Sequence, residues 1–286
     1  RWLVKSLACG AFDSISAFIY TESTHNRNLV DLLNRCDAHG LRVNLSLRPG
    51  TPLDFEWPGI GEIITANRLA DDPTVFAYDL AWEPSWGYRD QRRRGDGEWE
   101  EWIRQRYGSV EAAERDWGAA VPREDGKVAG PADADVTAES RIPRIAAAYR
   151  RFQDDFLSRK HMEARQKIRT LDQRHPTCGP TIMPYDFTGL ARSMDFMSPE
   201  GYGRIGDRER VRPGWFTAAY SRMVAPGRPV IWAEFGYTLW NRGERPETDP
   251  TLDFADALDR RHYLPATIAF TERYYREFYE MALDSQ

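Results

Sequence analysis

Val75-Phe76-Ala77-Tyr78-Asp79-Leu80-Ala81-Trp82-Glu83-Pro84 is a mostly apolar run that closes on a glutamate. A second run, Pro229-Val230-Ile231-Trp232-Ala233-Glu234-Phe235-Gly236, has the same arrangement. Apolar runs of this length, bounded by Pro or Gly, are typical of buried strands. Ionised carboxylates rarely close such strands, because burying an unpaired charge is expensive. The repeated pattern predicts two carboxylates, on Glu83 and Glu234, that face one cleft.

The segments before the first of these strands alternate between strand and helix patterns. Residues 14–20 have the composition of a strand, and residues 41–47 alternate apolar and polar side chains with the period of a strand. Residues 28–39 place four apolar side chains on one helical face, and Gly40 follows where a C-terminal cap belongs. With a short helix at about residues 60–69, the order is β-α-β-α-β. This order predicts a parallel sheet covered by helices.

A polar insertion interrupts the alternation between about residues 87 and 135. It contains two predicted short helices, at residues 98–107 and 110–117, and Ser109 is the expected N-cap of the second. Insertions that follow the C-terminal end of a strand in a parallel sheet commonly shape an active site. A long amphipathic helix is predicted next, at about residues 137–171.

The rest of the chain returns to the strand and helix pattern. Strands are predicted at residues 177–183, 195–197 and 230–233, and helices at about residues 215–224 and 268–283.

Six predicted strands favour an incomplete (β/α)₈ barrel, which needs eight strands when closed. The chain opens and ends on helix patterns, so the first strand and the last unit are expected outside the given sequence. An open doubly wound sheet is the alternative, but no predicted strand is followed by a Gly-x-Gly-x-x-Gly or Walker-type phosphate loop. The prediction is an α/β fold, a (β/α)₈ TIM barrel, formed as a single domain by residues 1–286.

The composition argues against nucleic-acid and membrane partners. Charged residues make up 29% of the chain and the net charge is −5, so the chain lacks the excess of Lys and Arg that is typical of proteins that bind nucleic acid or anionic lipid. No apolar stretch is long enough to span a membrane. The run Arg92-Arg93-Arg94 lies beside Asp90, Asp96 and Glu98, which predicts a solvated loop of mixed charge.

The cysteines are three, widely spaced, and show neither metal-ligand spacing nor a disulfide framework. They favour a reducing compartment, and therefore a cytoplasmic location over a secreted one. The chain opens on Arg1 rather than Met, so its start is expected to have been processed or cut. Localisation and oligomeric state stay open.

Polar residues follow the predicted strands at the point where each strand ends. In a barrel, this position is typical of an active site. Each residue also has a structural interpretation as a cap, a turn residue, a packed aromatic or a solvated charge, and the two glutamates could form an ion pair with Arg48. Besides the glutamates, the candidates are Tyr20, Arg48, Tyr185, Asp186, Glu200 and Tyr202, and the candidate sugar platforms are Trp86, Tyr185, Trp232 and Trp240.

Two carboxyl groups on one cleft are suited to cleaving a glycosidic bond. One, kept protonated, donates a proton to the leaving oxygen, and the other, ionised, attacks the anomeric carbon or activates water. Their surroundings must therefore push the two pKa values apart. Glu83 lies between two apolar neighbours, which suits the acid. Glu234 could be kept ionised by Tyr202 and Arg48, which suits the nucleophile.

These motifs resemble those of the glycoside hydrolases of clan A, such as families 5 and 42. Trp82-Glu83-Pro84 is similar to the motif that ends strand four of the clan barrel, and Ala233-Glu234-Phe235-Gly236 to the motif that ends strand seven. The strand count agrees if residues 14–20 form strand two. Pro199-Glu200-Gly201-Tyr202 resembles the end of strand six, and residues 102–118 resemble a helical segment of the family 42 β-galactosidases.

The resemblance implies a retaining β-glycosidase with Glu83 as acid/base and Glu234 as nucleophile. It implies a carbohydrate substrate, no metal ion and no organic cofactor, and a helical insertion after strand four. The expected substrate-binding residues are Arg48, Trp82, Trp86, Tyr185, Glu200, Tyr202, Trp232 and Trp240.

Trp82 departs from the clan pattern, in which an Asn usually precedes the acid/base. This departure, with the missing barrel ends, keeps a second function open: a catalytically inactive, carbohydrate-binding barrel. A metal-dependent barrel hydrolase is disfavoured, because the five histidines include no His-x-His pair and none ends a predicted strand.

Overall fold

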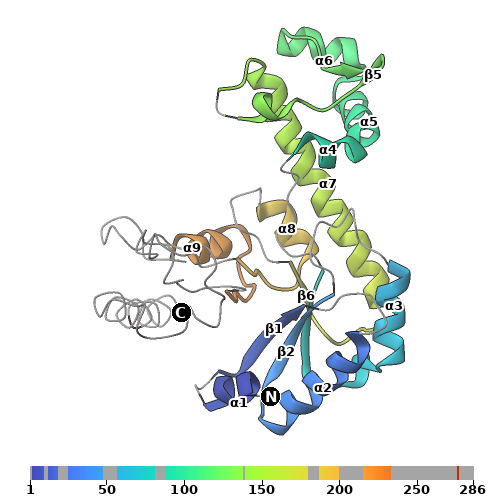
Figure 1. Ribbon diagram of the computed structural model, residues 1–286. Helices are drawn as coiled ribbons and strands as arrows, with labels where there is room; N and C mark the ends of the chain where they lie inside the picture. The colour runs from blue at the N-terminus through green and yellow to red at the C-terminus, as the bar shows by residue number, and fades with distance from the viewer. Residues whose placement is uncertain are drawn as a thin grey trace, which may run out of the picture. The chain divides into compact units, whose positions relative to one another are not determined.

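The computed structural model (Figure 1) describes residues 2–9, 12–18, 25–47, 57–80, 88–137, 139–179, 187–199, 215–232 and 276. The chain divides into two compact units, Arg1–Phe196 and Met197–Gln286. The closure of a barrel by residues 1–286 stays a prediction, because it depends on segments beyond these ranges.

A parallel sheet forms the centre of the first unit. Its strands are β1 (Ser14–Phe18), β2 (Arg42–Ser46), β3 (Val75–Asp79) and β6 (Thr177–Cys178), and their order in the sheet follows their order in the chain. The predicted strands are therefore confirmed over these residues, and each neighbour is parallel. This is the arrangement that successive β-α units of a barrel produce.

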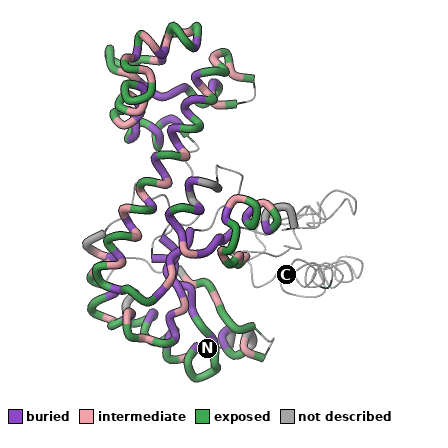
Figure 2. Tube along the Cα trace, turned by 180° about the vertical axis from the view of Figure 1, so that it is seen from behind, coloured by how far each residue is buried: buried purple, intermediate pink, exposed green. Residues whose placement is uncertain are grey.

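Three helices precede or connect the first strands: α1 (Trp2–Cys9), α2 (His25–Ala38) and α3 (Trp57–Ala66), the last followed by the 3₁₀ turn η2 (Leu69–Asp71). The predicted apolar face of α2 packs in the same core as β2 and β3, through Leu29 and Leu33. Gly40 ends this helix with a φ of 73°, a left-handed conformation that glycine adopts at little cost. Both β2 and β3 are buried along nearly their whole length (Figure 2).

The insertion between β3 and α7 (Pro143–Arg169) contains α5 (Asp96–Tyr107) and α6 (Val110–Trp117), as predicted. The Ser109 hydroxyl accepts a hydrogen bond from the Ala112 amide at 3.1 Å, which confirms the predicted N-cap. The structure adds α4 (Arg89–Arg92), the 3₁₀ turns η3 (Arg93–Gly95) and η4 (Asp133–Val136), and a hairpin of β4 (Arg123–Glu124) and β5 (Lys127–Val128).

The insertion has an aromatic core of its own. The rings of Trp99 and Trp117 stack with their centroids 5.9 Å apart and their planes 4° apart. Tyr149 and Phe152 of α7 complete this core, and their ring centroids lie 5.1 and 5.4 Å from that of Trp99. The insertion is thus a packed lobe, and the first half of α7 is part of it.

The prediction of a solvated, mixed-charge loop around residues 92–94 holds for the exposed Arg93 and Arg94 but is wrong for Arg92, and the segment forms helical turns. Only 1% of the Arg92 surface is exposed, and Arg89 is also buried. Both guanidinium groups form ion pairs with carboxylates that are distant in sequence, Glu124 and Asp133 among them. Burial is tolerated here because each charge is paired and hydrogen-bonded.

The long helix α7 begins six residues later than predicted, at Pro143 rather than about residue 137. Proline is favoured at the first position of a helix, where no amide hydrogen is needed. It also disfavours a helical conformation for the residue before it, and Ile142 has φ −127° and ψ 58°. The C-terminal half of α7 packs against the sheet core through Ala164 and Ile168.

Asp195 holds the end of the first unit in place. Its carboxylate accepts hydrogen bonds from Arg165, from Arg169 at 2.7 Å, and from the Thr177 amide and hydroxyl at 2.9 and 3.0 Å. Burial by itself raises the pKa of Asp195, but these donors outweigh it and hold the pKa below its usual value. These bonds fix the backbone at Asp195 beside Thr177 of β6.

A seven-residue helix, α8 (Phe187–Ser193), was not predicted. It packs on α7 at Gly189, where an added Cβ would collide with the Ser158 side chain. A short helix with a glycine at its contact point has little helical signal in its sequence.

His161 lies in the middle of α7 and is fully buried. Neither ring nitrogen has a hydrogen-bond partner within the described part of the chain. Burial lowers the pKa of His161 from 6.5 to about 4, because a charged imidazolium would lose its hydration there. The ring is therefore neutral in the folded protein at neutral pH.

We expect His161 to make the fold less stable as the pH falls. Its folded-state pKa lies below its unfolded-state value, so the unfolded chain binds the extra proton between about pH 6.5 and pH 4. The free energy of unfolding should fall by about 2 kcal/mol from this group between pH 7 and pH 5. Urea unfolding at both pH values checks this. The His161→Leu variant should lose that much less than wild type, and a variant of the exposed His39 should behave as wild type.

The second unit contains α9 (Trp215–Val224), as predicted, and a parallel bridge between Met197 and Val230. The Met197 amide donates to the Pro229 carbonyl, and the Ile231 amide donates to the Met197 carbonyl, each at 2.9 Å. Of the strands predicted at residues 195–197 and 230–233, the described residues form a single parallel bridge, between Met197 and Val230, and no longer strand. The prediction of a buried strand is wrong for the described residues of this run, because Pro229 and Ile231 are exposed and Val230 and Trp232 are only half-buried. Of the helix predicted at residues 268–283, only Arg276 is described, and it is helical.

Candidate active site

The carboxyl ends of the parallel strands place one row of side chains at a single edge of the sheet. Ser46, Asp79 and Cys178 are paired in register across β2, β3 and β6. All three are buried, and Asp79 has no exposed surface at all. In a barrel, this edge is where the catalytic residues lie.

This row lies on the sheet face opposite the helix-covered core. Leu45 and Tyr78, one position earlier on their strands, pack in the large core with α2 and α3, whereas Ala77 and Cys178 pack in a separate cluster with Phe196. Successive side chains of a strand point to opposite faces, so the two clusters mark the two faces of the sheet.

The second face is unusually polar for a buried surface. Asn44 donates to the Ser16 hydroxyl at 3.3 Å, and the Cys178 thiol lies 3.9 Å from the Asn44 carbonyl oxygen. Ser46 adds a buried hydroxyl at the strand ends. Buried polar groups are costly unless they are hydrogen-bonded, so a polar layer below the strand ends indicates a site rather than a packing core.

Asp79 is the residue that sequence reasoning missed. It lies in the centre of the apolar run that ends at Glu83, four residues before that glutamate. A charged residue inside an apolar run is the same signal that drew attention to Glu83 itself. The strand register now places Asp79 at the carboxyl edge, between Ser46 and Cys178.

Most of the predicted site residues lie outside the described residues, but the strands that lead to them are described. Glu83 follows Asp79, the last residue of β3, by four positions, and Glu234 follows the bridge residue Val230 by four positions. Trp232 is described and is half-buried. The predicted residues outside the described ranges are Tyr20, Arg48, Trp82, Glu83, Trp86, Tyr185, Asp186, Glu200, Tyr202, Glu234 and Trp240.

The sequence profile of glycoside hydrolase family 42, described as β-galactosidase, matches residues 60–248, more than half of the chain. The chain belongs to this family. The predicted resemblance to clan A, in its family 42 form, is thereby confirmed. No curated protein matches the chain.

Solved structures of family 42 β-galactosidases share the fold. The cold-adapted β-galactosidase from Rahnella sp. R3 is 18% identical with a TM-score of 0.66, and the match covers 84% of this chain and 43% of that one. The enzyme from Bacillus circulans sp. alkalophilus is 18% identical, with a TM-score of 0.60 and coverages of 82% and 42%. Gan42B from G. stearothermophilus is 13% identical, with a TM-score of 0.62 and coverages of 82% and 42%. The chain spans less than half the length of each.

A buried carboxylate–histidine pair in this family 42 chain lies beside Tyr78, whose side chain is on the helix-covered face of the sheet. Asp172 accepts hydrogen bonds from Tyr78 at 2.8 Å and from the His175 ring at 2.6 Å, just before β6 begins. Burial raises the pKa of Asp172, but its hydrogen bonds to His175, Arg174 and Tyr78 outweigh this and lower it. Burial, with the Asp172 bond, raises the pKa of Tyr78 far above its usual value. The network therefore belongs to the core on the helix-covered face and not to the row of Ser46, Asp79 and Cys178.

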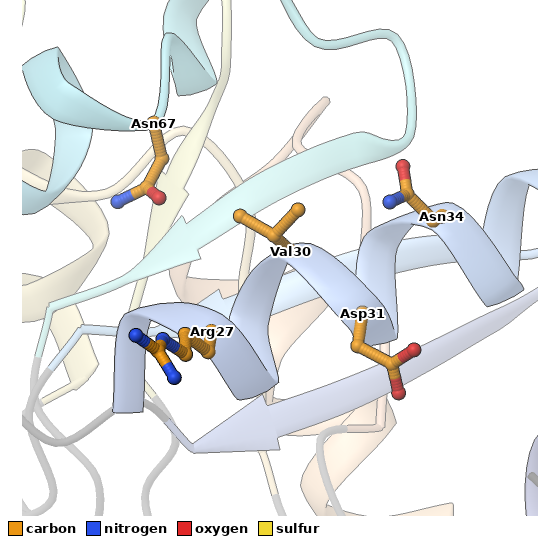
Figure 3. Close-up of a pocket in the computed structure, with 5 residues that line it drawn as sticks. All are labelled: Arg27, Val30, Asp31, Asn34 and Asn67. Carbon is orange, nitrogen blue, oxygen red and sulfur yellow. The ribbon is translucent and has the colours of Figure 1, made fainter. Parts of the chain in front are cut away.

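A shallow hollow of about 430 Å³ lies on the outer side of α2 (Figure 3). The opposite side of the same helix packs in the sheet core, so the hollow belongs to the helical layer and not to the strand ends. Its one carboxylate, on Asp31, is paired with Arg35 at 2.7 Å. The hollow is lined by Arg27, Val30, Asp31, Asn34 and Asn67.

No group of three or more His, Cys, Asp or Glu side chains in the described ranges could hold a metal ion. Within the same ranges, no helix combines the length and the apolar character needed to cross a bilayer.

Proposed function

We propose that this chain carries the catalytic centre of a retaining β-glycosidase that acts on β-galactosides. The observation that carries the proposal is the family 42 match, which extends over residues 60–248 and includes both Glu83 and Glu234. Each glutamate follows a parallel strand segment by four residues, which is the position expected for carboxylates that face one cleft.

The proposed reaction has two steps. Glu83 donates its proton to the glycosidic oxygen while the Glu234 carboxylate attacks the anomeric carbon, so the aglycone leaves and a glycosyl-enzyme ester forms. Glu83, now ionised, removes a proton from water, and the water oxygen attacks the same carbon. The ester breaks, the sugar leaves with its original anomeric configuration, and Glu83 regains its proton. The mechanism needs no metal ion or organic cofactor.

The local surroundings support separate roles for the two glutamates. Trp82 and Pro84 flank Glu83 with apolar groups, which favours its protonated form. We assign sugar binding to Arg48, Trp82, Trp86, Tyr185, Glu200, Tyr202, Trp232 and Trp240.

A solved structure of a family 42 enzyme supports a reaction that depends on glutamate. A catalytic mutant of Gan42B, the family 42 β-galactosidase from G. stearothermophilus, has a glutamate replaced by alanine. A glutamate in a catalytic role in that protein supports the proposal that glutamates carry the reaction here.

The experiment that tests the function is proton NMR of the chain with an aryl β-galactoside. We expect hydrolysis in which β-galactose is formed first and α-galactose accumulates only by mutarotation. If α-galactose is formed first, the mechanism is inverting and not retaining. Binding of galactosides without hydrolysis would favour the second function, an inactive carbohydrate-binding barrel, to which Trp82 in place of Asn points.

A further inference from the structure

Helix α7 carries a stripe of polar side chains along the side on which α8 packs. Four polar residues, spaced by four, three and four positions, share this face of the helix: Asp154, Ser158, His161 and Arg165. Helix α8 lies beside the middle of α7 (Figure 1), and its Gly189 comes close to the stripe. The face that a helix packs against its neighbours is normally apolar, so a polar stripe at this interface needs an explanation.

Two contacts bracket His161 within the interface. On its N-terminal side, Ser158 lies against Gly189, where an added Cβ would collide with the Ser158 hydroxyl. On its C-terminal side, Arg165 donates to the carboxylate of Asp195, two residues after α8 ends. His161 lies between these contacts on the same helix face, so its ring is buried against the second half of α8.

The interface buries polar atoms that lack hydrogen bonds. Within the part of the chain that the structure describes, neither ring nitrogen of His161, nor Oγ of Ser158, nor Nε of Arg165 has a partner. Unpaired polar atoms in a buried interface cost free energy, and a helix of seven residues has little stability of its own. We therefore expect α8 to leave α7 at a lower free-energy cost than the sheet core needs to unfold.

The charged groups around His161 are held in pairs that persist in mild acid. Arg165 pairs with Asp195, and the pKa of Asp195 is held below its usual value, so this carboxylate stays ionised at pH 5. Lys160 and Glu163 pair with each other at 3.2 Å on the opposite side of α7. Two further charged side chains belong to these helices near the interface, Asp154 almost two turns earlier on α7 and the exposed Arg192 of α8.

We propose that His161 makes the docking of α8 on α7 sensitive to acid, so that α8 opens as a local unit when the pH falls. Protonation puts a charge on a ring that the closed interface neither hydrates nor pairs, whereas water hydrates the charged ring in the open state. The open state therefore binds the extra proton, and its population rises as the pH falls from about 6.5 toward 4. This inference goes beyond the proposed function and does not depend on it.

Native-state amide hydrogen exchange of the full chain tests the inference at pH 7 and pH 5. Mass spectrometry of peptides from α8 and from β3 gives protection factors, which correct for the intrinsic effect of pH on exchange. We expect α8 to be less protected than β3 at pH 7, and its protection to fall about 20-fold at pH 5. A low concentration of urea should accelerate exchange in β3 but hardly in α8, because a local opening exposes little surface.

Variants assign the pH dependence to one ring. His161→Leu puts an apolar side chain of similar size in its place and should make the protection of α8 independent of pH between 7 and 5. His161→Met serves the same purpose if the leucine variant does not fold. The matched control, His39→Gln, changes an exposed histidine and should keep the wild-type fall. Gly189→Ala should lower the protection of α8 at both pH values, because its methyl group collides with Ser158.

Three results would overturn the inference. If α8 and β3 are equally protected at pH 7, α8 opens only when the whole unit unfolds. If the protection of α8 is the same at pH 5 as at pH 7 in the wild-type chain, its docking is not sensitive to acid. If the fall persists in folded His161→Leu or His161→Met, another group causes it.

Discussion

Glu234→Ala is expected to abolish nearly all turnover of aryl β-galactosides, with kcat/KM lowered by at least about 10³-fold. The reason is chemical: without the carboxylate, no ester can form on the anomeric carbon, and water must attack without a preceding displacement. Initial rates on 2,4-dinitrophenyl β-galactoside measure the loss. The substitution leaves the substrate-binding residues in place, so KM should change far less than kcat.

Azide provides the decisive control for this variant. A small anion that enters the space left by the carboxylate attacks the anomeric carbon once, and the product should be an α-galactosyl azide. The matched variant Glu101→Ala removes an exposed glutamate of α5 and should keep the wild-type rate. If the Glu234→Ala protein turns over aryl galactosides at the wild-type rate, Glu234 is not the nucleophile.

Glu83→Ala is expected to have the second-largest effect, and the effect should depend on the leaving group. A general acid contributes about 10²- to 10⁴-fold, and this contribution is lost on phenyl β-galactoside but not on substrates whose leaving group needs no proton. The pH profile should change as well. Wild-type kcat/KM falls at high pH as the acid ionises, and the variant should lack this fall.

Azide separates Glu83 from Glu234 by the configuration of the product. In the Glu83→Ala protein the glycosyl-enzyme still forms, so azide attacks the ester and should give a β-galactosyl azide. An α-azide from this variant would mean that the two roles are exchanged between the two glutamates.

The part of the fold that periodicity controls was predictable from the sequence. The strands within residues 14–20 and 41–47 and the helices α5, α6 and α9 each repeat an apolar pattern over their own length, so local residues suffice to identify them. The order of the strands in the sheet also followed, because β-α units place successive parallel strands side by side.

The elements that were missed depend on contacts distant in sequence. Arg89 and Arg92 are buried because Glu124 and Asp133 meet them across more than thirty residues, and no local pattern contains that information. The helix α8 exists because Gly189 allows a close approach to α7. The start of α7 is an exception, since Pro143 carried a readable signal.

For the candidate site, the sequence could identify residue types but not their placement. It identified two glutamates that close apolar runs. The first run begins in β3, which is parallel to β2 and β6, and the second begins at Val230, which forms a parallel bridge with Met197. It did not identify Asp79, because an aspartate in the middle of a run becomes meaningful only when the register places it at the carboxyl edge. The register depends on pairing with β2 and β6.

Helix α7 contributes Tyr149, Phe152 and Phe156 to the core of the insertion and Ala164 and Ile168 to the core of the sheet. A deletion of the insertion alone would leave three aromatic side chains of α7 without a cover, and such an exposed patch promotes aggregation. In evolutionary terms, the insertion and the first half of α7 can only be acquired, exchanged or lost together. Chimaeras between relatives should therefore cross over within α7, after Phe156, and not at the ends of the insertion.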